Sequence, residues 1–134
     1  MKNIKIKPMF NRVNPPKIGL ITLASDYIIE KDFHNVIKNK NINLFVNRIE
    51  CYNPLNKENL IKMSQNITKV TKNILPGEKI DCVAYACTSG TIAAGYTSIK
   101  KKVEKAKPNT KLTTPSTSSI LSLIHISEPT RPSR

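Results

Sequence analysis

Short apolar runs alternate along the chain with segments of helical periodicity, and this alternation constrains the fold more than any other feature. Apolar, β-branched runs of strand length occur at residues 17–23, 41–50, 80–86 and 111–114. Apolar residues recur at helical spacing over residues 28–38, 56–75 and 91–105, and a further helix is expected from Pro115. Because strand and helix alternate throughout, the sequence predicts an α/β fold, a parallel sheet flanked by helices with right-handed crossovers.

The two ends of the chain differ in character from the segment between them. Residues 1–16 are polar, contain three prolines and are interpreted as an irregular lead-in. The last stretch, residues 121–134, has neither Lys nor Asn, and its core LSLIHISEPTR resembles the translation of an adapter used in transposon-based sequencing libraries. We therefore expect residues 121–134 to be an adapter-derived artefact. On that expectation, residues 17–120 are an N-terminal α/β domain that is incomplete.

Composition excludes several classes of protein. No apolar run reaches the ~20 residues of a membrane span, and the N-terminus lacks the apolar core of a secretory signal. The net charge of +13 comes mostly from scattered lysines, while aromatic residues are only 5% and Trp is absent, so we expect no nucleic acid or membrane partner. Three cysteines without metal-ligand spacing predict no metal site and no disulfide framework, and favour the cytoplasm.

Polar clusters follow three of the predicted strands. The clusters are Ser25-Asp26 after the first strand, Cys87-Thr88-Ser89-Gly90 after the third, and Thr113-Thr114-Pro115-Ser116-Thr117 after the fourth. In parallel α/β sheets, ligands bind beyond the carboxyl ends of the strands. The three clusters are therefore expected to converge on one site.

Cys87 has the most distinctive chemistry among these residues. It is predicted to lie where a strand ends and a helix begins, and backbone N–H groups there stabilise a thiolate or a bound carboxylate. A thiolate so placed acts as a nucleophile, or as a general base towards a small acid. Alternatively, Cys87 is a small buried apolar residue. That second interpretation is favoured for Cys82, inside the strand, and a structural role is also expected for Cys51.

Other candidate residues have structural interpretations that the pattern leaves open. Asp26 also suits the N-cap of the following helix. The Thr-Pro-Ser-Thr segment also suits a helix start, with Pro in the first turn and hydroxyls as caps. His34 lies within a helical segment and is expected at the surface. The turn after the first strand lacks G-x-G-x-x-G, so a nucleotide-binding module is the weaker alternative.

Three segments together resemble a known group of enzymes. They are KIGLITLASDYIIEKDF (residues 17–33), IDCVAYACTSGTIAAG (residues 80–95) and KLTTPSTSSI (residues 111–120). They are similar to the maleate isomerase, arylmalonate decarboxylase and ectoine-utilisation family within the aspartate/glutamate racemase superfamily. The resemblance implies two similar α/β domains facing each other across a buried site, of which this chain supplies a Rossmann-like half. It also implies catalysis without a cofactor, and we expect a homodimer at full length.

The resemblance assigns roles to individual residues. Cys87 matches the first-half cysteine, which is the nucleophile of isomerases or one of two acid/base thiols in racemases, whereas arylmalonate decarboxylases carry glycine there. The residues at substrate-binding positions are Ser25, Asp26, Thr88, Ser89, Thr114, Ser116 and Thr117. Maleate isomerases typically carry Asn where this chain has Asp26, and the version here is closer to the ectoine-utilisation branch.

These implications lead to a functional expectation. We expect a cofactor-independent, cysteine-dependent isomerase of a small dicarboxylic acid, of the maleate cis–trans isomerase type. The alternatives within the superfamily are an aspartate/glutamate-type racemase and an arylmalonate-decarboxylase-like enzyme of ectoine utilisation. The alternative from another class is a non-catalytic α/β ligand-binding module. Because the second-half cysteine would follow residue 120, we expect these 134 residues alone to be inactive.

Overall fold

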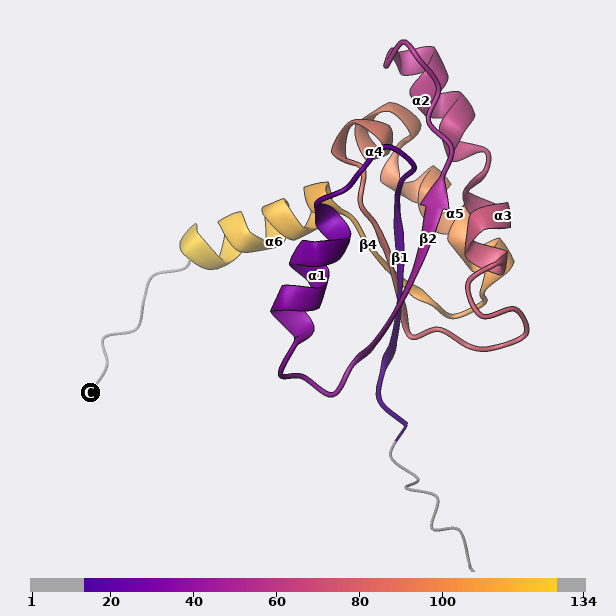
Figure 1. Cartoon of the computed structure of the whole chain (residues 1–134). Coiled ribbons are helices and arrows are strands. Elements are labelled where there is room, and N and C mark those ends of the chain that lie inside the picture. Colours follow the sequence, from indigo (N-terminus) through magenta and orange to yellow (C-terminus); the bar gives the residue numbers. More distant parts are fainter. Residues whose placement is uncertain (1–13, 128–134) are drawn as a thin grey trace, which may run out of the picture.

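The computed structural model describes residues 14–127, with side chains as far as residue 124 (Figure 1). Its four strands are β1 (Lys17–Leu23), β2 (Asn43–Ile49), β3 (Cys82–Tyr85) and β4 (Lys111–Thr113). They form one sheet in the order β2-β1-β3-β4, and every neighbouring pair is parallel. The predicted α/β fold with a parallel sheet is therefore confirmed.

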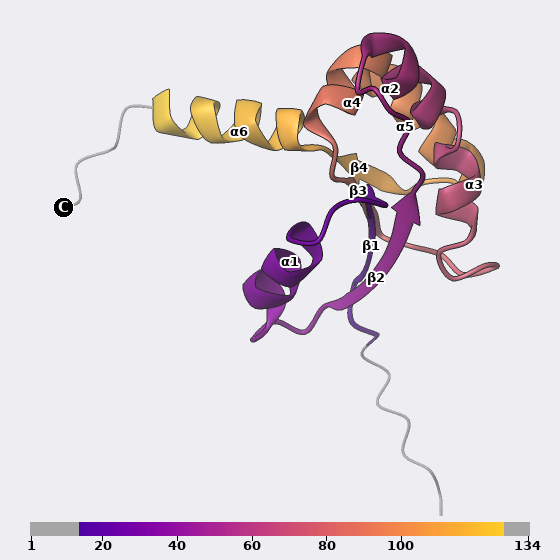
Figure 2. The same cartoon turned by 45° about the horizontal axis from the view of Figure 1, so that its top comes forward.

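Helices connect the strands and cover both faces of the sheet. Within the described residues they are α1 (Ile29–Ile37), α2 (Lys57–Ser64), α3 (Ile67–Lys72), α4 (Thr88–Ala94), α5 (Tyr96–Ala106) and α6 (Pro115–Ser127). Figure 2 shows α1 on one side of the sheet and α2, α3, α4 and α5 on the other. This division follows from the strand order, because the chain moves one way across the sheet from β1 to β2 and the opposite way afterwards. Right-handed crossovers then place their helices on opposite faces.

The helix expected over residues 56–75 is broken in the structure. The break lies at Gln65 and Asn66, whose backbone N–H groups donate to the carbonyl oxygens of Lys62 and Met63, three residues back instead of four. The side-chain amide of Asn66 meanwhile donates to the hydroxyl of Tyr52 at 3.0 Å. Local polar bonds therefore divide a segment whose apolar spacing is continuous.

The helix expected over residues 91–105 is also two helices. It begins earlier than predicted, at Thr88, and Gly95 separates α4 from α5. The φ of Gly95 is 84°, which lies outside the helical region and is readily adopted only by glycine. Gly95 therefore ends one helix and redirects the chain into the next.

The main core lies between the sheet and the helices α2, α3 and α5. Its buried apolar members are Ile21, Ile49, Leu60, Met63, Ile67, Ile74, Ile80, Val83, Tyr85, Cys87, Ile99, Val103 and Leu112. By contrast, α1 buries none of its residues completely. Because Tyr85 and Cys87 belong to this cluster, the carboxyl end of β3 rests on the rigid part of the molecule.

The helix α6 leads away from the rest of the molecule in both views (Figures 1 and 2). It continues past residue 120, where the sequence predicts a change of origin. On either side of that point, Ile120 and Leu121 are 56% and 58% exposed. No residue of α6 with a described side chain belongs to the buried core.

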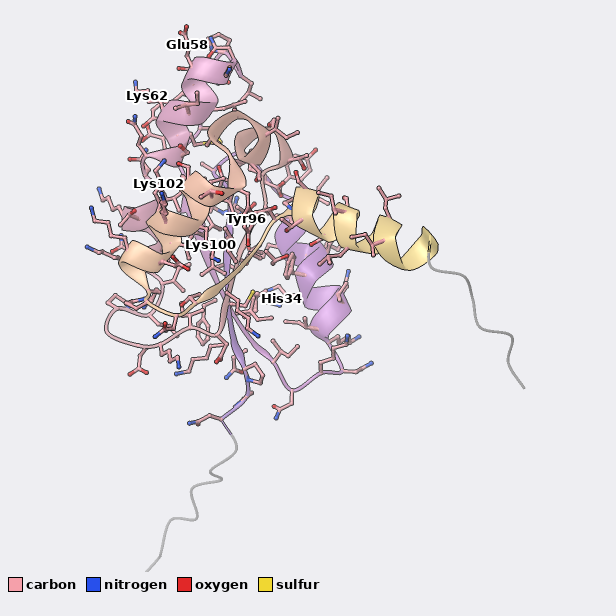
Figure 3. All side chains as sticks on the ribbon, turned by 180° about the vertical axis from the view of Figure 1, so that it is seen from behind. His34, Glu58, Lys62, Tyr96, Lys100 and Lys102 are labelled. Atoms are coloured by element: carbon pink, nitrogen blue, oxygen red, sulfur yellow. The ribbon has the colours of Figure 1, made fainter. Side chains whose placement is uncertain are left out.

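Lysines are distributed over several elements, as the sequence suggests. Figure 3 shows Lys62 on α2, and Lys100 and Lys102 on α5. The Nζ atom of Lys62 lies 4.6 Å from the ring centroid of Tyr52, and that of Lys102 donates to Ser64 Oγ at 3.1 Å. Among the helices of residues 14–127, none combines the length and apolar character that crossing a bilayer requires.

Candidate active site at the carboxyl edge of the sheet

The strand order changes direction at β1, which has β2 on one side and β3 on the other. In open parallel sheets such a switch point, at the carboxyl ends of the strands, is where ligands bind. Ser25, Cys51 and Cys87 each lie two residues beyond the end of their strand, after β1, β2 and β3. The adjoining backbone is paired, because Ala24 N–H donates to Ile49 O and Ala86 N–H donates to Ile21 O, both at 2.9 Å. Three polar side chains thus leave the sheet at neighbouring points.

Cys87 occupies the strand–helix junction that the sequence predicts. Its backbone is extended, and it is the N-cap of α4. The thiol is buried, with the residue 4% exposed, and Sγ accepts a hydrogen bond from Gly90 N–H at 3.3 Å. The carbonyl oxygen of Cys87 accepts from the backbone N–H and the hydroxyl of Thr91, at 3.0 and 2.6 Å. The side chain is therefore held in one orientation by the first turn of α4.

Thr88 and Ser89 form the exposed side of that first turn. Ser89 Oγ lies 3.9 Å from Cys87 Sγ. The first turn of a helix leaves backbone N–H groups without intrahelical partners, and these groups attract anions. The predicted pair thus has two exposed hydroxyl groups, of which that of Ser89 lies near the thiol.

Ser25 lies beside a cysteine that the sequence leaves without a functional role. Ser25 Oγ is 3.6 Å from Cys51 Sγ, and the Cys51 thiol also points towards Ile49 O at 3.8 Å. Cys51 is interpreted from the sequence as structural, yet it is partly buried at the same edge of the sheet as Cys87. Its position directly after the strand predicted over residues 41–50 is the signal that the sequence offers, and a structural cysteine has the same position.

Asp26 lies two residues before Ile28, which is the N-cap of α1 in place of the predicted Asp26, and its carboxylate binds the backbone at the start of that helix. Its Oδ1 accepts hydrogen bonds from Ile28 N–H at 2.8 Å and from Ile29 N–H at 2.9 Å. These bonds from Ile29 and Ile28, together with the nearby Arg48 guanidinium, lower the pKa of the Asp26 carboxyl against a smaller opposing effect of burial. Arg48 also donates to the carbonyl oxygens of Leu23 and Asp26. The turn after β1 is thereby fixed, with an ionised carboxylate in it.

The hydroxyls of Thr114 and Thr117 form a reciprocal cap at the start of α6. Thr114 N–H donates to Thr117 Oγ1 at 3.0 Å, Thr117 N–H donates to Thr114 Oγ1 at 3.2 Å, and the two hydroxyls are 3.1 Å apart. This is the arrangement of a capping box. Between them, Ser116 Oγ is buried and has no hydrogen-bond partner within the described residues. The structure therefore shows a capping role for two of the three predicted residues.

Tyr85 is a further polar residue of this edge that the sequence does not single out. It is fully buried, and its hydroxyl has no hydrogen-bond partner in the part of the chain that the structure describes. Burial above all, and then charge on the thiols of Cys87 and Cys51, raise the pKa of Tyr85 far above its usual value. Within the strand predicted over residues 80–86, Tyr85 is indistinguishable from an ordinary core aromatic in the sequence.

An apolar cavity lies on the opposite, α1 side of the sheet. It has a volume of about 240 Å³ between α1, β3, β4 and the start of α6, and residues such as Phe33, Ala84 and Pro115 line it. None of its lining residues is charged, so it suits an apolar group and not a carboxylate. Within residues 14–127 no group of three or more His, Cys, Asp or Glu side chains is placed to hold a metal ion.

Comparison with known proteins identifies the fold. No protein-family profile matches the sequence, and no curated protein does. Among solved structures, the maleate isomerase Iso from Pseudomonas putida S16 is similar with a TM-score of 0.64 and 16% identity, over 84% of this chain and 49% of that chain. A variant of that enzyme solved with maleate gives the same values. The Nocardia farcinica maleate cis-trans isomerase bound to TRIS has a TM-score of 0.66 and 13% identity, over 81% of this chain and 48% of that chain. This chain thus spans about half the length of these isomerases and shares the α/β fold of that half.

Proposed function

We propose that this chain supplies the nucleophile-bearing half of a cofactor-independent isomerase that acts on a small dicarboxylic acid, of the maleate cis–trans isomerase type. The observation that carries the proposal is the position of Cys87 at the switch point of the sheet. There its side chain caps α4 and is oriented by a hydrogen bond from Gly90 N–H. The fold shared with two maleate isomerases supports the reaction type. The substrate, the cysteine dependence and the activity of a longer protein are parts of this proposal.

In the proposed reaction Cys87 acts as a thiolate. Its Sγ forms a bond to one alkene carbon of a cis diacid, and the π electrons move onto the other carbon and its carboxylate as an enediolate. The central bond is then single and rotates. Return of the electrons reforms the double bond in the trans geometry, breaks the C–S bond and regenerates the thiolate. Atoms and electrons balance without a proton donor, oxidant or cofactor.

The neighbouring residues have proposed roles in holding the substrate. The exposed hydroxyls of Thr88 and Ser89, with the N–H groups of the first turn of α4, would donate to the carboxylate that takes up charge. Ser25 would donate from the loop after β1. Thr114, Ser116 and Thr117 would border the site from the start of α6, which contacts α4.

Asp26 favours a second candidate of the same superfamily, an amino-acid racemase. Its carboxyl has a lowered pKa and is therefore ionised at neutral pH, so it repels a second substrate carboxylate and attracts a substrate ammonium group. In that reaction the Cys87 thiolate would remove the proton on Cα, and an acid on the opposite face would return one. The charge of Asp26 thus supports an amino acid as the alternative substrate.

Protection of thiols against alkylation tests the proposed function. We would alkylate the chain with iodoacetamide near neutral pH and map the cysteines by mass spectrometry, with and without maleate. We expect maleate to slow alkylation of Cys87 and to leave Cys82 unchanged, because Cys82 lies at the other end of β3. The protection should weaken in Ser89→Ala and persist in Thr97→Ala, a matched change at an exposed position on α5.

The outcomes of this experiment separate the candidates. Stronger protection by aspartate or glutamate than by maleate would replace the isomerase with the racemase. Equal labelling of all three cysteines, with no protection by any acid, would contradict the proposal and favour a ligand-binding module.

A further inference from the structure

The hydroxyl of Tyr85 is placed where a hydroxyl is costly. The side chain is fully buried in the main core, and the hydroxyl has no hydrogen-bond partner within residues 14–127. A buried donor without a partner destabilises a fold, and phenylalanine would fill the same space without that cost. The hydroxyl therefore calls for an explanation other than packing.

The Tyr85 hydroxyl and the Cys87 thiol meet at the same point, beside Gly90. A Cβ atom built on Gly90 would lie 2.8 Å from Cys87 Sγ and 2.8 Å from the Tyr85 hydroxyl oxygen. The next atom around that point is the apolar Cε of Met63, from α2, at 3.3 Å. The thiol and the phenol oxygen thus both lie beside the Cα atom of Gly90, where any side chain would overlap them.

The electrostatic surroundings keep Tyr85 in its donor form. After burial, the charge of the Cys87 thiol and a side-chain interaction with it are the next causes that raise the pKa of Tyr85, followed by the charge of Cys51. These thiols, at the start of α4 and after β2, are the ionisable groups that act on the hydroxyl, while Met63 faces it from α2 without charge. Tyr85 therefore keeps its proton at neutral pH and well above it, so its hydroxyl remains a donor.

We propose that Tyr85 is a positioning residue for Cys87, whose hydroxyl turns to donate a hydrogen bond to Sγ when the thiolate forms. With Gly90 N–H, already 3.3 Å from Sγ, the thiolate then accepts two hydrogen bonds from the protein. Two donors fix the direction of the remaining sulfur lone pair towards the open side, where Thr88 and Ser89 lie. The inference rests on the proposed use of Cys87 as a thiolate. It adds a residue, Tyr85, whose hydrogen bond stabilises the thiolate relative to the thiol.

A pH titration of the thiolate tests this inference on the intact chain. The ultraviolet absorbance of thiolate is recorded against pH, and subtraction of the Cys87→Ser variant isolates the signal of Cys87. Loss of one hydrogen bond to a charged acceptor in Tyr85→Phe should move the midpoint of that signal upward by about one to two pH units. In Tyr96→Phe the midpoint should not move, because that hydroxyl donates to Leu112 O at 3.2 Å instead.

A second measurement covers the case in which Tyr85→Phe does not fold. Ring-fluorinated tyrosine, incorporated in place of tyrosine, keeps the shape and strengthens the phenol as a donor. The Cys87 midpoint should then move downward, and the shift should persist in Tyr96→Phe. A Cys87 midpoint that is unchanged both in Tyr85→Phe and after fluorination of the tyrosines would overturn the inference.

The titration separates this inference from the proposed function. It measures the ionisation of Cys87 and requires no substrate. If acids fail to protect Cys87 but Tyr85→Phe shifts its midpoint, the proposed function fails and the positioning role stands. If acids protect Cys87 and the midpoint does not shift, the positioning role fails alone.

Discussion

Gly90 allows the first turn of α4 to close over the Cys87 thiol. In Gly90→Ala the added methyl group would overlap both Sγ and the Tyr85 hydroxyl, each 2.8 Å from its position. We expect a loss of about 1–3 kcal/mol in the free energy of unfolding, the range for overpacking a core. Chemical denaturation measures this loss. Ile92→Ala, at a 73% exposed position of the same helix, is the control and should change stability by less than about 0.5 kcal/mol. Equal stability of the two variants would show that a methyl group fits beside Sγ without overlap.

Asp26 gives the fold a pH dependence of known sign. Hydrogen bonds from Ile29 and Ile28 lower the pKa of its carboxyl in the folded chain, so the unfolded chain binds a proton more readily. These hydrogen bonds therefore stabilise the fold above the unfolded pKa of Asp26, and this stability is lost as pH falls through the folded pKa. We expect Asp26→Ala to cost about 1 kcal/mol at neutral pH, and the difference from the unsubstituted chain to shrink below about pH 4.

Thermal or urea unfolding across pH measures this dependence, with Asp32→Ala as the control. Asp32 is an exposed carboxylate of the same helix and does not cap it. A cost of Asp26→Ala that stays constant down to strongly acidic pH would contradict the role assigned to the ionised carboxylate.

At the residue scale, the sequence identifies the thiol but not its surroundings. Cys87 is predictable because a polar turn follows a short apolar run, and that local order fixes the strand–helix junction. Tyr85 and Cys51 are not predictable in the same way, because their closeness to the thiol and to Ser25 depends on packing among elements far apart in the chain. A tyrosine or cysteine at the end of a strand has the same local sequence pattern whether its role is only to pack in the core or to act in a functional site.

At the scale of the elements, the spacing of apolar residues predicts where helices form, but it does not predict where a helix is interrupted. The spacing of apolar residues continues through Gln65–Asn66 and through Gly95, so each pair of helices is expected as one. The interruptions come from backbone states, a positive φ at Gly95 and short-range bonds at Gln65 and Asn66, which periodicity does not record. Because the helix breaks at Gly95, α4 can begin directly after Cys87 while α5 takes a different direction and packs on α3.

Lys107 holds the end of α5 to the loop that follows α3. It is only 6% exposed, and its Nζ donates to Leu75 O and to Glu78 O, both at 2.7 Å. We expect Lys107→Met, which keeps the apolar stem, to cost about 1–3 kcal/mol because both carbonyl groups lose a charged donor. Urea unfolding checks this, with the exposed Lys105→Met as a matched change in the same helix. A cost no larger than that of Lys105→Met would show that water replaces the ammonium group.

At the scale of the whole molecule, the strand order determines where the candidate site lies. Alternation of strands and helices predicts a parallel sheet, and the order β2-β1-β3-β4 then creates the switch point between β1 and β3. The polar residues that follow β1 and β3 leave the sheet at this edge, and their convergence on one site stays a prediction. The order itself is a tertiary property, since any of the four strands satisfies the same apolar pattern. The similarity to half of two maleate isomerases agrees with this arrangement at the level of the fold.

The most direct test of the account is whether Cys87 adds to an activated double bond that carries carboxylates. The chain is incubated with maleate, and the cysteines are mapped by mass spectrometry for the thioether that remains when the added carbon takes a proton from water. The neutral acceptor acrylamide, applied in parallel, lacks the carboxylates. The account predicts a maleate adduct on Cys87 in clear excess over Cys51 and Cys82, and no such preference with acrylamide. The absence of a maleate adduct on Cys87, or equal adducts on all three cysteines, would contradict it.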